Sequence, residues 1–502
     1  MRRHAAGPGT LRRVYRAAVL TAVVVAGAVL AAFALLGGDE LPQFADVPLD
    51  SDPFAYEPGR DSAFAVRAAT GQSHVVYAKS PGGVAETARR VERFRPRIEE
   101  VAEDTGVDAD MLEAMVFLES AGRPEVAASD DLDGAVGLTQ ILAETGTALL
   151  GMHVDVEASE RLTRRIRRAE RHGEVARAGD LRARRREVDE RFDPQKSLEA
   201  TGRYLELALA RFGREDLAVV SYHMGIGNLE NVLAAYGEDD PSYARLFFDA
   251  TPDRHPQTYR LLTSLGDDSK TYLWRVYACR EAMRLYREDP AELARLSRLQ
   301  AAKASDEEVL HPRSGTEVFE HPDDLEEAYA NGELRPFPED AARLGLRPAR
   351  GMGELAGGLD ADRALYRGLR PEAYALAVYL AAGVREVAGT RAPLVVTSTV
   401  RDLDYQRLLA RRNPFATRAY SVHTTGFAFD VRRRYASRGQ AAAFQYMLDR
   451  LQALNLIAWV REPGVIHITV SGEARRLLSL DPRKRRDKPA WGRRGRFSTS
   501  KE

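Results

Sequence analysis

The feature that most constrains this chain is an uncharged apolar run from Ala17 to Leu36. A helix of that length spans the hydrocarbon core of a bilayer. Arginines precede the run and acidic residues follow it, and basic residues favour the cytoplasmic side. We therefore expect a single-pass anchor in the cytoplasmic membrane, with residues 1–16 as a basic cytoplasmic tail and the bulk of the chain outside. A cleaved signal peptide is the alternative, because Ala32-Phe33-Ala34 is typical of a cleavage site.

Composition narrows the class of protein further. The length of 502 residues leaves room for two or three domains, and a hydrophobic content of 44% is enough for packed cores. The 73 basic and 74 acidic side chains nearly cancel, which argues against a general attraction to nucleic acid or to a membrane surface. Cys279 is the single cysteine, so the chain forms no internal disulfide.

Shifts in composition and periodicity divide the chain into segments. Helical periodicity begins near Val84 and continues to about residue 297, and it includes two highly charged helices that we expect to form a hairpin. Stretches rich in Pro, Gly and acidic residues lie on both sides of this region. The expected segments are a linker over 37–83, a helical domain over 84–297 with a charged insertion over 155–192, a linker over 298–350, a second domain over 351–482 and a basic tail over 483–502.

The second domain has a mixed pattern that predicts an α+β fold. Helical spacing covers residues 371–388 and 441–454. Leu394–Ser398 and Val465–Val470 are rich in β-branched residues and are predicted strands.

One acid in the helical domain stands out as a candidate catalytic group. Residues 111–118 form a mostly apolar helix whose last turn carries Glu119, and Asp108 or Asp110 is placed to cap its start. A carboxyl group there meets the negative end of the helix dipole, and partial burial favours its protonated form. Such an acid protonates a leaving oxygen near neutral pH. The alternative is an exposed glutamate that simply ends a helix.

Two later segments, taken together with the one that carries Glu119, form a recognisable pattern. Phe117-Leu118-Glu119-Ser120 is followed by Gly134-Ala135-Val136-Gly137-Leu138-Thr139-Gln140 and then by Ser221-Tyr222-His223-Met224-Gly225-Ile226-Gly227-Asn228. This constellation, over about residues 90–240, resembles the lysozyme-like lytic transglycosylases. The resemblance implies Glu119 as general acid and then base, Ser120 as the residue that orients it, and Gln140, Tyr222 and Asn228 as glycan contacts. Two positions depart from the family: Thr139 replaces a usual Met, and His223 replaces a frequent Asn.

The mechanism depends on whether a second carboxylate takes part. Glycoside hydrolysis usually needs two, and Asp130, Asp131 and Asp133 lie in the loop before Gly134. The resemblance implies instead that the substrate's N-acetyl group assists departure and that the sugar's C6 hydroxyl closes a 1,6-anhydro ring. We expect such cleavage of the MurNAc–GlcNAc bond of peptidoglycan, with lysozyme-type hydrolysis as the alternative. This domain is expected to need no cofactor.

The second domain carries a metal-binding pattern. His423 and Asp430 lie in the run Ser421-Val422-His423-Thr424-Thr425-Gly426-Phe427-Ala428-Phe429-Asp430, and His467 lies in the closing strand. Two imidazoles and a carboxylate leave a fourth position for water, as in catalytic zinc sites. The run resembles the D-alanyl-D-alanine zinc carboxypeptidases, whose ligand positions match His423, Asp430 and His467. Arg401 matches the substrate-polarising arginine of that family. Without the other two ligands, His467 would by default be a structural histidine of a strand.

The general base is the weak point of this second resemblance. The family places a glutamate three residues before the last histidine, and that position is Gly464 here. Glu462 lies two residues further upstream, followed by Pro463. Peptidase activity therefore stays open. Either Glu462 serves as the base, or the domain binds zinc and stem peptide without cutting.

The sequence predicts a multidomain protein with an N-terminal transmembrane helix, an α-helical lysozyme-like domain and an α+β zinc-peptidase-like domain. Its expected partners are peptidoglycan glycan strands, stem peptides and the cytoplasmic membrane, with no nucleic acid. A scaffold that retains both folds without catalysis is the competing class. Arginines between 483 and 496 with Trp491 are expected to form a solvated tail.

Overall fold

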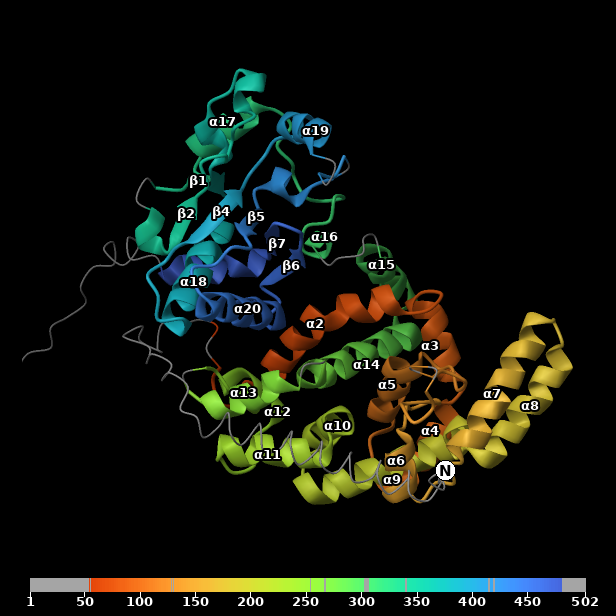
Figure 1. Cartoon of the computed structure of the whole chain (residues 1–502). Coiled ribbons are helices and arrows are strands. Elements are labelled where there is room, and N and C mark those ends of the chain that lie inside the picture. The colour runs from red at the N-terminus through yellow and green to blue at the C-terminus, as the bar shows by residue number, and fades with distance from the viewer. Residues whose placement is uncertain are drawn as a thin grey trace, which may run out of the picture. The chain divides into compact units, whose positions relative to one another are not determined.

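The computed structural model describes residues 54, 56–127, 129, 131–252, 254–265, 268–301, 307–338, 341–413, 416–418 and 420–480 (Figure 1). The expected anchor at 17–36, Asp130 and the basic tail at 483–502 lie outside this part of the chain. Within the described ranges, none of the helices combines the length and the hydropathy that a bilayer span requires.

The first part of the described chain is helical. Its α-helices are α2 (Asp61–Lys79), α3 (Val84–Glu92), α4 (Arg95–Thr105), α5 (Ala109–Ser120), α6 (Ala143–Ala148), α7 (Val156–Arg171), α8 (Val175–Val188), α9 (Pro194–Phe212), α10 (Glu215–Met224), α11 (Ile226–Tyr236), α12 (Tyr243–Asp249), α13 (Pro256–Ser264), α14 (Tyr272–Glu288) and α15 (Pro290–Gln300). Two short 3₁₀ turns, η2 (Glu190–Phe192) and η3 (Ser269–Thr271), lie between them.

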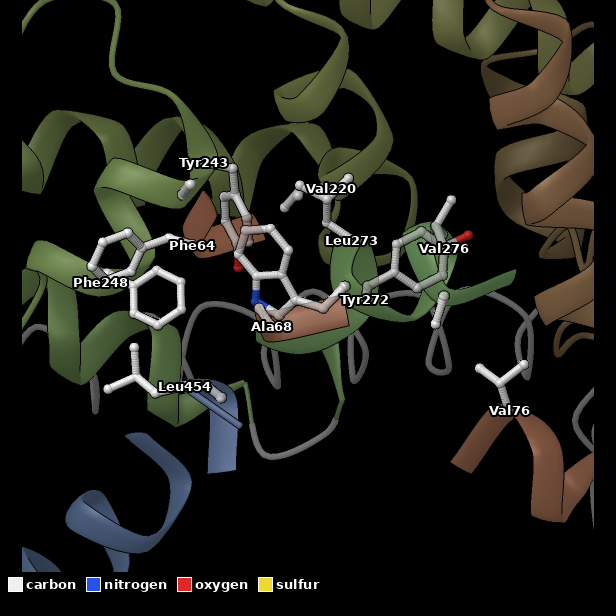
Figure 2. Packing of buried hydrophobic residues seen from close by; sticks show 14 of the residues in the cluster. Phe64, Ala68, Val76, Val220, Tyr243, Phe248, Tyr272, Leu273, Val276 and Leu454 are labelled. Atoms are coloured by element: carbon white, nitrogen blue, oxygen red, sulfur yellow. The ribbon is translucent and has the colours of Figure 1, made fainter. Parts of the chain in front are cut away.

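Helix α14 forms the centre of this helical domain and packs against α2 and α5. Figure 2 shows Tyr272, Leu273 and Val276 of α14 among apolar side chains that include Phe64 and Ala68 of α2. These side chains are buried, and burial of that apolar surface stabilises the domain by roughly 25 cal/mol per Å².

Helix α2 corrects the expected linker over 37–83. Residues 61–79 of that segment form a packed helix whose Phe64, Ala68, Val76 and Tyr77 are buried. The helix was missed because these four residues do not follow a regular spacing along it, so the sequence shows little amphipathic periodicity.

Helices α7 and α8 confirm the expected charged hairpin. They pack on each other through a small apolar cluster of Leu162, Ile166, Ala169, Ala178 and Leu181. Most of their arginines are exposed. The hairpin therefore has its own core beneath a charged, solvated surface.

The second part of the chain is an α/β domain. Its elements are α16 (Glu307–Leu310), α17 (Pro322–Ala330), β1 (Arg335–Pro336), η4 (Ala341–Leu344), β2 (Leu346–Pro348), η5 (Ala356–Leu359), η6 (Arg363–Tyr366), β3 (Gly368–Leu369), α18 (Pro371–Val387), β4 (Leu394–Ser398), α19 (Leu403–Arg412), η7 (Val422–Thr425), β5 (Ala428–Arg432), α20 (Arg438–Ala453), β6 (Ile457–Arg461), β7 (Val465–Val470) and η8 (Gly472–Leu480). The predicted strands at 394–398 and 465–470 are confirmed as β4 and β7.

A five-stranded sheet with the order β2-β4-β5-β7-β6 organises this domain. Strands β2 and β4 are parallel, and the other neighbouring pairs are antiparallel. Helices α18 and α20 pack together and against strands of this sheet. Because side chains alternate across a strand, Phe429 and Val431 contribute to the apolar core, whereas Asp430 projects from the opposite face.

The expected linker over 298–350 is also corrected. Strand β2 pairs in parallel with β4, and the backbone N–H of Phe319 donates to the carbonyl oxygen of Thr424 at 2.8 Å. The α/β domain therefore begins before residue 351. Strand β2 has three residues, too few to show a periodic pattern, which is why the sequence did not reveal it.

Candidate functional site

Glu119 lies at the last turn of α5, where the sequence analysis places it. Asp108 caps the start of this helix, because its Oδ1 accepts from the backbone N–H groups of Asp110 at 2.7 Å and Met111 at 3.2 Å. The helix ends where Ala121 adopts a left-handed conformation with φ 55°. Apolar side chains of the helix are buried, whereas Glu119 keeps partial access to solvent.

The carboxyl group of Glu119 accepts a hydrogen bond from Tyr272, the first residue of α14. The Tyr272 hydroxyl lies 2.6 Å from Oε1 of Glu119. Burial raises the pKa of Glu119 from its usual value of 4.5 to about 7, and the Tyr272 hydrogen bond opposes this rise. A carboxyl group with this pKa holds and releases a proton near neutral pH, as general acid–base catalysis requires.

Tyr222, at the end of α10, links this acid to the Gly-rich loop at 134–140. The ionised form of Glu119 contributes to the raised pKa of the Tyr222 phenol, whose main cause is burial. The Tyr222 hydroxyl donates to the carbonyl oxygen of Thr139 at 2.7 Å. Tyr222 therefore contacts the loop directly and lies near enough to Glu119 for their charges to interact.

The two departures from the family pattern are both accommodated by neighbouring side chains. Thr139 is fully buried, and its hydroxyl contacts those of Ser197 at 2.7 Å and Thr201 at 2.8 Å on α9. The Nδ1 atom of His223 lies 2.8 Å from the Ser269 hydroxyl, and its ring lies 4.9 Å from that of Tyr272. His223 thus packs against the residue that binds Glu119.

Other predicted site residues bond to backbone groups. Ser120 is buried, and its hydroxyl donates to the Val116 carbonyl at 3.2 Å. The Gln140 amide donates to the carbonyl oxygens of Gly137 at 2.9 Å and Val126 at 3.2 Å, and the Asn228 amide donates to Met224 at 2.8 Å. These bonds fix the helix end and the loop. Roles in orienting Glu119 or in touching glycan stay predictions.

A buried arginine that the sequence analysis missed supports the Gly-rich loop. Arg191 in η2 donates to the carbonyl oxygens of Leu132 at 2.7 Å, Gly134 at 3.1 Å and Ile141 at 3.3 Å. Its own carbonyl oxygen packs so close to Gly137 that a Cβ there would lie 1.9 Å from it. Gly137, with φ 85°, is therefore required both for the backbone conformation and for this contact.

In the α/β domain, the sheet register brings the three predicted metal ligands together. Asp430 of β5 pairs with His467 of β7 in the antiparallel register, and His423 lies in η7. One ligand atom from each of the three side chains lies within 4.8 Å of the others. Asp430 Oδ1 is 2.9 Å from His467 Nδ1 and 3.2 Å from His423 Nε2. All three residues are buried.

The hydrogen bonds of His423 set its tautomer. Its Nδ1 lies 2.7 Å from the Thr399 carbonyl oxygen, which only accepts, so Nδ1 carries the proton and Nε2 faces Asp430 with a lone pair. Burial and the nearby Arg401 lower the pKa of His423 to about 4. Burial alone would raise the pKa of Asp430, but interaction with the protonated forms of the two imidazoles holds it well below its usual range. A neutral imidazole, an ionised carboxylate and a second imidazole fit a zinc ion.

Arg401 and Glu462 lie at the pocket that contains this cluster. Arg401 approaches Oδ2 of Asp430 at 3.5 Å and donates to the Ser398 hydroxyl at 2.7 Å. Glu462 and Gly464 belong to the β6–β7 hairpin loop, and both line the same pocket as the three ligands. Glu462 is therefore on the wall of the pocket despite its altered spacing, while its role as base stays a prediction.

Part of the helical domain matches a known protein family. Residues 174–244 match the Transglycosylase SLT domain. A search of curated proteins found no match for the chain. The SLT match supports a lytic transglycosylase domain and implies peptidoglycan as its substrate class.

The matched range contains Tyr222 and Asn228 but neither Glu119 nor the Gly-rich loop. Hydrogen bonds connect these parts, since Tyr222 of the SLT region binds Thr139 of the loop. The chain thus combines a helical SLT domain with a C-terminal α/β region. No local signal marks Tyr272 as a partner of Glu119, because the two residues are 153 positions apart.

Proposed function

We propose that the SLT domain cleaves the MurNAc–GlcNAc bond of peptidoglycan and forms a 1,6-anhydro product. The observation that carries this proposal is Glu119, a partly buried carboxyl group with a pKa of about 7 at the end of α5. Its charge interaction with Tyr222 connects it to the region that matches the family, and its hydroxyl partner Tyr272 lies outside that region.

In the proposed reaction, protonated Glu119 gives its proton to the glycosidic oxygen as the bond to the MurNAc C1 breaks. The substrate's N-acetyl oxygen stabilises C1 by attacking it. The C6 hydroxyl oxygen then attacks C1 and displaces the N-acetyl oxygen, while ionised Glu119 takes up the hydroxyl proton. One carboxyl group therefore acts first as the acid and then as the base. It regains the proton that it gave away, and no water takes part.

Support for a single-carboxylate mechanism comes from the surroundings of Glu119. Among the described residues, the groups that shift its pKa include no second carboxylate. The carboxylate of Asp131 accepts from the backbone N–H of Asp133 at 3.0 Å. Lysozyme-type hydrolysis remains the alternative product outcome.

Mass spectrometry of soluble products from purified peptidoglycan tests the proposal. We expect muropeptides lighter by one water than their hydrated equivalents, and none from the Glu119→Gln variant. Hydrated sugars would instead establish a muramidase. No glycan products from well-folded protein would favour a wall-binding scaffold.

We further propose that the α/β domain binds one zinc ion through His423, Asp430 and His467. A zinc ion bound there would supply an activated water and polarise a peptide carbonyl. In this proposal Arg401 orients the substrate carbonyl, and Glu462 holds a proton on the pocket wall. The substrate would be the stem peptide, trimmed at its terminal D-alanine or bound without cutting.

Metal analysis of the purified chain tests the ligand set separately from catalysis. We expect about one zinc per chain, falling well below one in His423→Ala. Unchanged zinc in this variant would refute the ligand set. Release of D-alanine that is lost in Glu462→Gln, with zinc retained, would establish Glu462 as the base.

The apolar run at 17–36 is proposed as a single-pass anchor in the cytoplasmic membrane, with the SLT and α/β domains outside. The support is the charge bias at its two ends. We expect the intact chain in the membrane fraction and protease access to both domains from outside. A mature mass that lacks residues 1–34 would show a cleaved signal peptide instead.

A further inference from the structure

A second pocket, which we call the arginine pocket, lies beside the metal cluster in the α/β domain. It is lined by four arginines, Arg313, Arg407, Arg411 and Arg418, and by one carboxylate, that of Glu320. The four arginines are exposed at its surface. Four positive charges against one negative charge make it a pocket that attracts anions.

Most of this charge is not neutralised by neighbouring carboxylates. Arg407 pairs with Asp404 at 2.8 Å, and Asp404 also binds His321 at 2.7 Å. Within the described ranges, no carboxylate forms an ion pair with Arg313, Arg411 or Arg418. Guanidinium groups without a carboxylate partner offer paired N–H donors that match a carboxylate of a ligand.

The arginine pocket and the metal-cluster pocket share a wall formed by Gln406 and Thr417. Gln406 is buried, and its Oε1 accepts from Nη1 of Arg401 at 2.8 Å. Its Nε2 donates to the Thr417 carbonyl at 2.8 Å. Arg401 in turn approaches Asp430 at 3.5 Å. The two pockets therefore lie next to each other, separated by Gln406 and Thr417.

We propose that the arginine pocket binds the free carboxylate groups of a stem peptide whose scissile end lies at His423, Asp430 and His467. This inference rests on the proposed function of the α/β domain and adds a binding determinant to it. The pocket selects peptides by charge, because carboxylates are recognised by the arginine forks and an amidated peptide loses that interaction. Exposed arginines act here through the sum of their charges rather than through one strong pair.

Isothermal titration calorimetry with the full chain in mild detergent tests the proposal. The probe is the pentapeptide L-Ala-γ-D-Glu-L-Lys-D-Ala-D-Ala, compared with the same peptide carrying an amidated D-Glu. We expect Arg313→Gln/Arg411→Gln to weaken binding of the acidic peptide about tenfold, as two partly screened charge contacts predict, and to leave binding of the amidated peptide nearly unchanged.

Arg412→Gln is the matched control. Arg412 is exposed on the same helix α19 but does not line the arginine pocket. Equal affinity for both peptides, or an equal loss in the Arg412 variant, would overturn the proposal. The His423→Ala variant keeps the two hypotheses distinguishable, because its zinc content tests the metal ligands, whereas its discrimination between the peptides, which should persist, tests the arginine pocket.

Discussion

Arg191 and Asp189 form an ion pair in which both side chains are fully buried. The guanidinium approaches the carboxylate at 2.9 Å through both Nε and Nη2. Asp189 also accepts from the hydroxyl of Ser159 at 2.8 Å, near the start of α7. Because Arg191 donates to carbonyl oxygens of the loop at 132–141 as well, one pair connects the base of the charged hairpin to the loop beside Glu119.

Removing Arg191 should destabilise the helical domain strongly. Arg191→Ala leaves Asp189 as a buried, unpaired charge, which costs about 3–5 kcal/mol of unfolding free energy. Chemical denaturation, followed by a signal that reports unfolding of the helical domain, measures this decrease in unfolding free energy. Arg177→Ala is the control, because Arg177 forms an exposed pair with Glu174 and should cost about 1 kcal/mol or less. Equal small losses in both variants would contradict the anchoring role of Arg191.

Replacing Glu119 should change the pH dependence of stability. The folded chain binds a proton at Glu119 up to a pKa of about 7, whereas the unfolded chain loses it near 4.5. The contribution of Glu119 to the unfolding free energy is therefore fully present below pH 4.5. It decreases by up to about 3 kcal/mol as the pH rises from 4.5 to 7. The unfolding free energy of Glu119→Gln minus that of the wild type should rise over this interval and stay constant above it. A difference independent of pH would rule out the raised pKa.

Removing the hydroxyl group of Tyr272 should shift the pH profile of glycan cleavage. Its hydrogen bond stabilises the ionised form of Glu119, so Tyr272→Phe raises the pKa of Glu119 further. We expect the limb of the pH–rate profile that reports Glu119 to move to higher pH. Tyr277→Phe on the same helix α14 is the control, since Tyr277 makes no described contact with Glu119. A profile unchanged by Tyr272→Phe would show that this bond does not set the acid's pKa.

The hydroxyl network at Thr139 should matter for stability. Thr139→Val keeps the side-chain volume but removes the partner of Ser197 and Thr201, which are buried. The expected cost is about 1–3 kcal/mol of unfolding free energy. The Thr139→Val/Thr201→Val double variant should cost less than the sum of its single variants, because the two hydroxyls share a hydrogen bond. Strict additivity would show that they do not act together.

The sequence located the elements with strong local signals. Strands β4 and β7 matched the predicted residues, and the apolar helix ending at Glu119 had both its cap and its acid in the expected places. Helix α2 and strand β2 were assigned to linkers. The first has weak periodicity, and the second has three residues.

The candidate sites likewise contain residues that the sequence marks and residues that it does not mark. Glu119, Tyr222 and the three predicted metal ligands are marked by spacing along the chain. Tyr272 and Arg191 carry no such mark, since each acts through a contact that exists only after distant helices or loops have packed. Sequence spacing marks the candidate acid, whereas tertiary structure sets its pKa and supports its surroundings.

The contact between Glu119 and Tyr272 has a consequence for synthesis of the chain. A ribosome adds Glu119 153 residues before Tyr272, so a nascent chain that ends earlier lacks α14 altogether. Without α14 packed against α5, Glu119 is a solvated carboxylate that is ionised at neutral pH. A truncated or partly translated product would therefore carry Glu119 in its ionised form at neutral pH, and only a completed helical domain would hold the proton that the proposed reaction requires.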